Sequence, residues 1–231
     1  MRARQRHLNA GAAGATTVYD ARFVYGVADG NGISTWSDRT NNNDATQGTA
    51  TYQPTFQEAE LGGNPVVRFD GSNDRMEHGL TLDDCLVLWV GNTTNNGVEQ
   101  RVFGSGVGAG ATAYTFIGNR SNIVQFASNN FASASFNSHT SGIVSWSING
   151  TNVTFTRNGG SASTSSFAKY NGTSASQSYA SLGSGGATPT ARSQFLNGDI
   201  GCVVVFAETV SDPMRRRLER GAGFVWKISC N

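Results

Sequence analysis

Residues 143–157 read Ile143-Val144-Ser145-Trp146-Ser147-Ile148, then Asn149-Gly150-Thr151-Asn152, then Val153-Thr154-Phe155-Thr156-Arg157. Two runs of strand-forming residues therefore flank an Asn-Gly pair, which is the strongest short-range signal for a β-hairpin. In the second run, Val153 and Phe155 point to one face of a strand and Thr154 and Thr156 to the other. The stretch predicts an antiparallel hairpin with one buried face.

Short apolar runs of the same kind recur on both sides of this hairpin. They cover residues 66–70, 86–90, 100–103, 114–118, 123–127 and 201–206, and turn-forming residues bound them. Charged residues make up only 14% of the 231-residue chain, against about 25% in typical globular proteins. The chain holds 29 glycines, and this composition suits strands and tight turns better than helices. We expect an all-β fold, an antiparallel two-sheet jelly-roll sandwich, whose core is anchored by Trp36, Phe69, Trp89 and Trp146.

One short helix is predicted near the C-terminus. Ser211 can cap it, and Asp212 and Pro213 suit its first turn. A single apolar stripe follows, made of Met214, Leu218, Ala222 and Val225. The arginines at 215, 216 and 220 lie mostly away from that stripe. We interpret them as a solvated helix face rather than a nucleic-acid patch, because no aromatic residues are interleaved with them.

The chain divides into a basic N-terminal arm, residues 1–17, and one domain, residues 18–231. The arm carries Arg2, Arg4 and Arg6, and it is either a flexible tail or an assembly arm that packs on a neighbouring subunit. No run resembles a secretory signal, and none approaches the roughly 20 apolar residues that span a bilayer. A net charge of +1 gives no general attraction to nucleic acid or to anionic membranes, so we expect neither as a partner.

Two segments carry a family resemblance. The first runs from Ile33-Ser34-Thr35-Trp36-Ser37-Asp38 to Gly63-Asn64-Pro65-Val66-Val67-Arg68-Phe69-Asp70-Gly71, and the second is Asn197-Gly198-Asp199-Ile200 ahead of an apolar strand and the C-terminal helix. Their order resembles the concanavalin A-like lectin/glucanase superfamily, in particular the laminin-G-like jelly rolls of bacterial surface and phage proteins. The resemblance covers about residues 18–228, and it implies a fold far better than a function.

The resemblance also implies where glycosidase chemistry would lie. Glycosidases of this superfamily carry paired carboxylates as Glu-x-Asp-x-x-Glu on one strand, because hydrolysis needs an acid and a base or nucleophile on either side of the bond. The chain lacks this spacing. Its only close pair, Glu58 and Glu60, lies in a stretch without a strand pattern. We therefore expect that the protein is not an enzyme.

The sequence offers candidate residues for two kinds of binding site, one for calcium and one for carbohydrate. Laminin-G-like domains often hold a calcium ion at the rim, which Asp70, Asn73 and Asp74 could ligate, or Asp29 with Asn31; otherwise we expect no cofactor. Carbohydrate binding would use aromatic rings that stack on sugars, beside asparagines for the hydroxyls. The candidate sugar-binding residues are Tyr52, Phe131, Tyr170 and Tyr179.

The sequence favours a non-enzymatic, laminin-G-like structural protein of a virion, such as a phage decoration, fibre or tail component. Its partners would be other virion proteins or copies of itself, and it would lie at the virion surface or reach the exterior without a signal peptide. The alternative is a free-standing carbohydrate-binding or adhesion module that binds cell-surface glycan. A glycoside hydrolase is a third class, disfavoured by the missing carboxylate motif.

Overall fold

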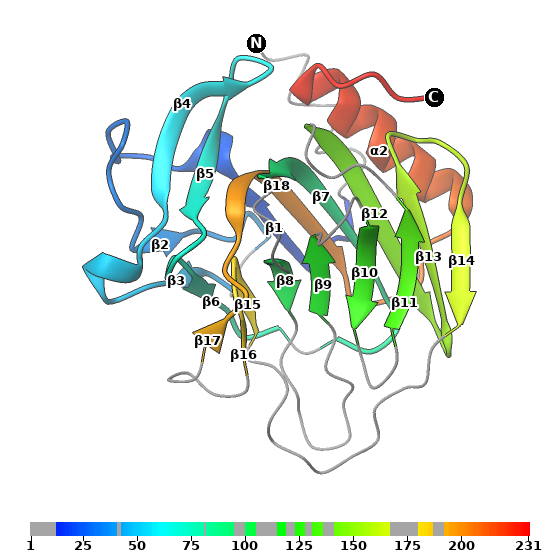
Figure 1. Cartoon of the computed structure of the whole chain (residues 1–231). Helices are drawn as coiled ribbons and strands as arrows, with labels where there is room; N and C mark the ends of the chain where they lie inside the picture. Colours follow the sequence, from blue (N-terminus) through cyan, green and yellow to red (C-terminus); the bar gives the residue numbers. More distant parts are fainter. Residues whose placement is uncertain are drawn as a thin grey trace.

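The structure is a computed structural model of the chain (Figure 1). It describes residues 13–40, 43–80, 82–94, 100–104, 115–118, 123–127, 131–135, 141–166, 180–186 and 192–231. Residues 1–12, with Arg2, Arg4 and Arg6 of the predicted arm, lie outside this part, so the arm stays a prediction.

The first sheet, sheet A, is antiparallel and has eight strands. These are β1 (Thr17–Asp20), β4 (Thr55–Leu61), β5 (Asn64–Asp70), β7 (Cys85–Thr93), β12 (Gly142–Asn149), β13 (Asn152–Arg157), β14 (Ser163–Ser166) and β18 (Asn197–Phe206). Seven of them lie in the order β14-β13-β12-β7-β18-β5-β4, and β1 pairs with β18 outside this path. β18 lies at the centre, because one of its edges pairs with β7 while the other pairs first with β5 and then with β1.

The second sheet, sheet B, is also antiparallel and also has eight strands. These are β2 (Thr35–Trp36), β3 (Ala45–Thr46), β6 (Met76–Glu77), β8 (Gln100–Gly104), β9 (Thr115–Gly118), β10 (Ile123–Ala127), β11 (Phe131–Ser135) and β15 (Ser181–Leu182). Their order is β11-β10-β9-β8-β15-β6-β3-β2. A two-stranded ribbon, β16 (Gly185–Gly186) with β17 (Arg192–Ser193), and two 3-10 turns, η1 (Ala21–Phe23) and η2 (Ala50–Tyr52), complete the β part.

The predicted all-β sandwich is confirmed. The decisive stretch forms the β12–β13 hairpin, in which Trp146 pairs with Phe155 and both side chains are buried. Trp146 also contacts Phe103 of β8, with ring centroids 6.1 Å apart, so this face of the hairpin lies between the two sheets. The predicted anchors are all at most 1% exposed: Trp36, Phe69, Trp89 and Trp146.

The stretch around Glu58 and Glu60 belongs to β4, so our interpretation of it as a loop was wrong. The strand pattern is hidden because the pairing with β5 shifts register between Gln57 and Leu61. Ala59 has a positive φ of 57° at this irregularity. A bulge of this kind breaks the alternation on which a sequence pattern depends.

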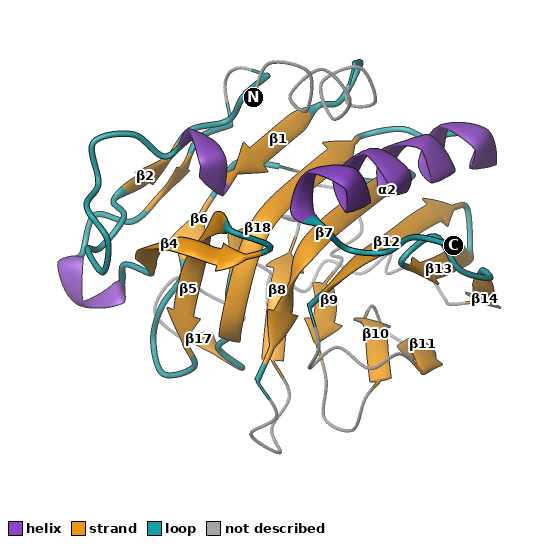
Figure 2. Cartoon of the chain, turned by 90° about the horizontal axis from the view of Figure 1, so that it is seen from above, coloured by secondary structure: helices purple, strands orange, loops and turns teal. Residues whose placement is uncertain are grey.

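Helix α2 (Asp212–Trp226) covers the outer face of sheet A and contacts β12 and β7 (Figure 2). Figure 2 shows the resulting layers, with α2 on one side of sheet A and β8–β11 on the other. The apolar stripe faces the sheet as predicted, since Leu218 and Ala222 are fully buried. No helix in the described part of the chain is long and apolar enough to cross a membrane.

The start of α2 differs from the prediction in its hydrogen bonds. Ser211 occupies the cap position, but its side chain makes no capping bond. Instead, Asp212 in the first turn binds Arg215 and Arg216. Arg215 is 3% exposed, so the interpretation of all three arginines as a solvated face was wrong for this one.

Arg215 is buried because it belongs to a polar network between the helix and the sheet. Its Nη1 donates to Oε1 of Glu219 at 2.7 Å and to the hydroxyl of Thr156 at 3.0 Å. The same Oε1 accepts hydrogen bonds from Ser145, at 2.5 Å, and from Thr156. Ser145 and Thr156 are neighbours on the outward face of β12 and β13, so the network fixes α2 to the hairpin.

Gly201 marks the point at which β18 changes partner. The register with β7 shifts between Ile200 and Cys202, and the partner on the other edge changes from β5 to β1 at the same place. A Cβ at position 201 would lie 2.6 Å from the ring of Trp226, which is fully buried. The last turn of α2 therefore packs against a strand position where only glycine fits.

We predict that Arg215→Met destabilises the protein by about 3–5 kcal/mol, because Glu219 is then left as a buried carboxylate without its cation. Arg216→Met is the matched control. Arg216 pairs with Asp212 on the exposed side of the same helix, and such a surface pair contributes at most about 1 kcal/mol. Urea denaturation of both variants tests this expectation, and equal losses of stability would contradict it.

Candidate functional site

The predicted calcium ligands lie in the turn after β5. Oδ1 of Asp70 accepts the backbone N–H groups of Ser72, at 2.8 Å, and Asn73, at 3.2 Å. Oδ2 of Asp74 accepts the N–H of Asp70 at 2.9 Å. Both carboxylates therefore order the backbone of their own turn. Calcium at this turn stays a prediction.

The second predicted calcium site consists of Asp29 and Asn31. Its carboxylate also binds a backbone group, since Oδ1 of Asp29 accepts the N–H of Glu58 at 2.9 Å. In the described part of the chain, no three His, Cys, Asp or Glu side chains are grouped so that they could hold a metal ion.

The turn is sensitive to pH. Burial, together with the charge of Asp70, raises the pKa of Asp74 from its usual value of 3.8 to about 6. The folded protein therefore binds a proton here between about pH 4 and 6, where the unfolded chain does not. Protonation of Asp74 therefore raises the free energy of unfolding as the pH falls from about 6 towards 4. This contribution disappears as the pH rises again through 6.

We predict that Asp74→Asn removes this dependence while keeping the oxygen that accepts the N–H of Asp70. The free energy of unfolding, measured at pH 4.5 and pH 7 for the native chain and the variant, tests it. The native chain should gain more stability at the lower pH than the variant does. An identical pH dependence in both proteins would contradict the assignment.

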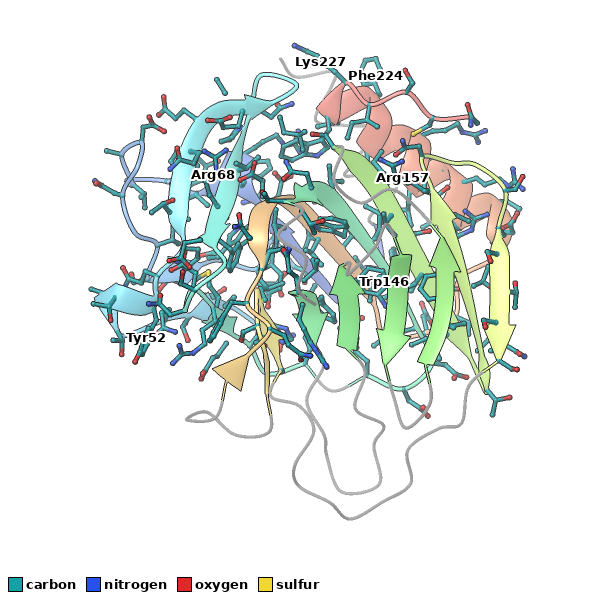
Figure 3. All side chains as sticks on the ribbon, viewed as in Figure 1. Tyr52, Arg68, Trp146, Arg157, Phe224 and Lys227 are labelled. Carbon is teal, nitrogen blue, oxygen red and sulfur yellow. The ribbon has the colours of Figure 1, made fainter. Side chains whose placement is uncertain are left out.

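Only one of the four predicted sugar-binding residues has a side chain that the structure describes. Tyr170 and Tyr179 lie outside the described residues, and Phe131 begins β11 in a segment described by its backbone alone. Tyr52 ends the turn η2 and is half-buried. Figure 3 shows it on the side of the molecule where β2 and β3 lie.

The structure brings Tyr52 together with Arg75. The carbon at the centre of the Arg75 guanidinium lies 4.0 Å from the Tyr52 ring centroid, and the backbone N–H of Arg75 donates to the carbonyl of Tyr52 at 3.0 Å. A guanidinium over an aromatic face is a favourable cation–π contact. Nothing in the sequence predicted this pair, because the two residues come together only through the pairing of strands between them.

The guanidinium of Arg75 is nearly desolvated and incompletely bonded. Its side chain is 12% exposed, and Nη1 donates to the carbonyl of Asn73 at 3.2 Å. Among the described residues, its Nε is buried without a hydrogen-bond partner and forms an ion pair with Glu77 alone, 3.9 Å away. The Glu77 side chain is itself 40% exposed. We call Tyr52, Arg75 and Glu77 the Tyr52 site.

Strand alternation places the Tyr52 site on the outer face of sheet B. In β6, Met76 is fully buried between the sheets, so its neighbours Arg75 and Glu77 point the other way. Glu77 lies in register with Thr46 of β3 and Ser181 of β15. The site therefore presents an aromatic ring, hydrogen-bond donors and a carboxylate on the polar side of a sheet.

In the described part of the chain, two other aromatic side chains are exposed, and neither was predicted from the sequence to bind a ligand. Tyr25, after η1, is 75% exposed, and Phe224, in the last turns of α2, is 55% exposed. Phe224 could have been found, because it lies off the apolar stripe that the spacing predicts. For Tyr25 the sequence holds no comparable signal, since it stands in an irregular segment.

Comparison with solved structures finds this fold elsewhere. No protein-family model matches the chain, and no curated protein matches its sequence. A Trypanosoma rangeli sialidase in complex with sialic acid is 12% identical, with a TM-score of 0.61 over 92% of this chain and 34% of that one. The T. rangeli sialidase in complex with the inhibitor DANA is 13% identical, with a TM-score of 0.57 over 95% of this chain and 38% of that one.

These similarities establish a shared β-sandwich fold, and the chain spans little more than a third of the sialidase chains. They also correct one expectation. The expectation that the protein is not an enzyme is contradicted, because the matching structures are enzymes. That expectation rested on the absence of one carboxylate motif, and a missing motif excludes only the chemistry that uses it. The laminin-G type and the phage setting have no counterpart in these similarities.

Proposed function

We propose that the protein binds carbohydrate through the Tyr52 site. The observation that carries this proposal is the half-buried Tyr52 ring on the outer face of sheet B, with the Arg75 guanidinium over one face of the ring and the half-exposed Glu77 carboxylate 3.9 Å from that guanidinium. Carbohydrate binding was the alternative that the sequence left open, and Tyr52 is one of the four residues predicted for it.

The chemistry of the site matches that of a sugar. A pyranose has an apolar C–H face that packs on aromatic rings, and its edge carries hydroxyl groups that both donate and accept hydrogen bonds. Arg75 supplies donors only, and an ionised Glu77 supplies acceptors only.

The shared fold is consistent with carbohydrate binding, but the proposal rests on the side chains of the Tyr52 site. The T. rangeli protein that shares this fold is a sialidase and has been seen with sialic acid, yet a fold hosts many functions, and the side chains of the site must decide. Hydrolysis of a bound glycan remains an outcome that the binding experiment can reveal.

The virion role stays a prediction, and so do the laminin-G type, the virion partners and the location at a particle surface. They rest on the sequence resemblance and on the predicted arm of residues 1–17.

We predict that Tyr52→Ala weakens glycan binding at least tenfold, because the sugar loses its stacking surface. A glycan array followed by calorimetry on the strongest ligand measures the change. Tyr25→Ala is the matched control, since it removes an exposed tyrosine that does not belong to the Tyr52 site and should leave the affinity unchanged. A blank array, or equal losses in both variants, would contradict the proposal.

A further inference from the structure

Asparagine followed by glycine recurs in this chain, and the pair is chemically labile. The backbone nitrogen of a glycine can attack the carboxamide of the residue before it, because glycine has no side chain to hinder the approach. Four such pairs lie in the described part of the chain, and they begin at Asn31, Asn149, Asn158 and Asn197. The structure ranks them, because each pair reacts only as far as its surroundings let the nitrogen reach the carboxamide carbon.

Two of the pairs are held rigidly. The carboxamide oxygen of Asn158 accepts the N–H of Ile143 at 2.8 Å, and Gly159 is buried. Gly198, which follows Asn197, is also buried, and it lies in β18 between its partners in β5 and β7. Neither pair can rearrange unless a paired part of the sheet opens first.

The pair at the tip of the β12–β13 hairpin is protected by a charge. Asn149 is exposed, but the N–H of Gly150 donates to Oδ1 of Asp84 at 2.9 Å. The glycine nitrogen must lose its proton before it attacks, and a neighbouring carboxylate opposes the negative charge that this loss creates. Asp84 therefore slows the reaction at Asn149.

The pair of Asn31 and Gly32 has neither kind of protection. Both residues are exposed. Among the described residues, neither the carboxamide of Asn31 nor the N–H of Gly32 forms a hydrogen bond. Gly32 pairs with Thr55 through an isolated bridge rather than a continuous ladder. Local opening of one bridge costs less than opening of a sheet, so this peptide is the most free to rearrange.

We propose that Asn31 is a site of spontaneous deamidation. The deprotonated nitrogen of Gly32 attacks Cγ of Asn31 and closes a succinimide ring. The bond between Cγ and Nδ2 breaks, and the amide group leaves as ammonia with the proton that the Gly32 nitrogen gave up. Water then opens the ring at either carbonyl, which yields aspartate or isoaspartate. The net change exchanges ammonia for water and adds one negative charge.

Isoaspartate at this position uncovers the edge of sheet A. β4 is the edge strand (Figure 1), and the segment around Asn31 covers it. Three backbone hydrogen bonds hold the segment, from Gly30 N–H to Phe56 O at 2.8 Å, from Phe56 N–H to Asn31 O at 2.9 Å and from Ile33 N–H to Pro54 O at 2.9 Å. Isoaspartate adds one carbon to the main chain between these bonds, so they cannot all keep their register. An uncovered edge strand is a template for pairing with another chain.

The test is incubation of the whole protein at pH 8 and 37 °C, followed by peptide mapping by mass spectrometry and by enzymatic methylation of isoaspartate. In the folded protein, modification at Asn31 should accumulate at least tenfold faster than at Asn158 or Asn197, and faster than at Asn149. In urea the four pairs should react at similar rates, because the protection comes from the fold. Equal rates in the folded protein, or a faster reaction at Asn149, would overturn the assignment.

Hydrogen exchange tests the effect on β4. The N–H groups of Ile33 and Phe56 should exchange faster in aged protein than in fresh protein. Asn31→Gln, aged in parallel, should keep the exchange rates of its fresh sample, because its longer side chain cyclises far more slowly; Asn149→Gln is the matched control and should age as the native chain does. Isoaspartate at Asn31 with unchanged exchange would overturn the inferred uncovering of β4. These measurements need no glycan, so their outcome is independent of the proposed function.

Discussion

The two central strands of sheet A, β7 and β18, are buried on both faces, and the rest of the structure depends on that constraint. All but one residue of β7, and all but one of β18, are buried, so the two central strands need cover on each side. Sheet B supplies it on one face and α2 on the other (Figure 2). The Arg215–Glu219 network and the contact of Trp226 with Gly201 fix where the helix lies.

The same constraint determines which face of the sandwich is left uncovered. Among the described elements, sheet A has no free face at its centre, whereas sheet B turns one face to the core and the other outward. Alternation along β6 therefore sends Met76 inward and sends Arg75 and Glu77 to the side on which Tyr52 lies.

The sequence predicted what is local. The β12–β13 hairpin, the short strands and the helix stripe each depend on residues that are close along the chain, and the structure has all of them. The sequence could not show that Arg215 is buried. The hydroxyl groups that complete its network, those of Ser145 and Thr156, come from a hairpin that is distant along the chain. The proximity of Tyr52 and Arg75 was hidden for the same reason. The inference against an enzyme failed differently, since a missing motif excludes only the chemistry that uses that motif.

The most direct test of the account is a crystal structure of the protein with its strongest neutral glycan ligand. The account predicts a sugar ring packed on Tyr52 at the outer face of sheet B, with a hydroxyl within hydrogen-bond distance of Arg75, about 3 Å. A ligand seated on another face, with the Tyr52 ring untouched, would contradict the claim that closing sheet A with a helix makes sheet B the recognition face.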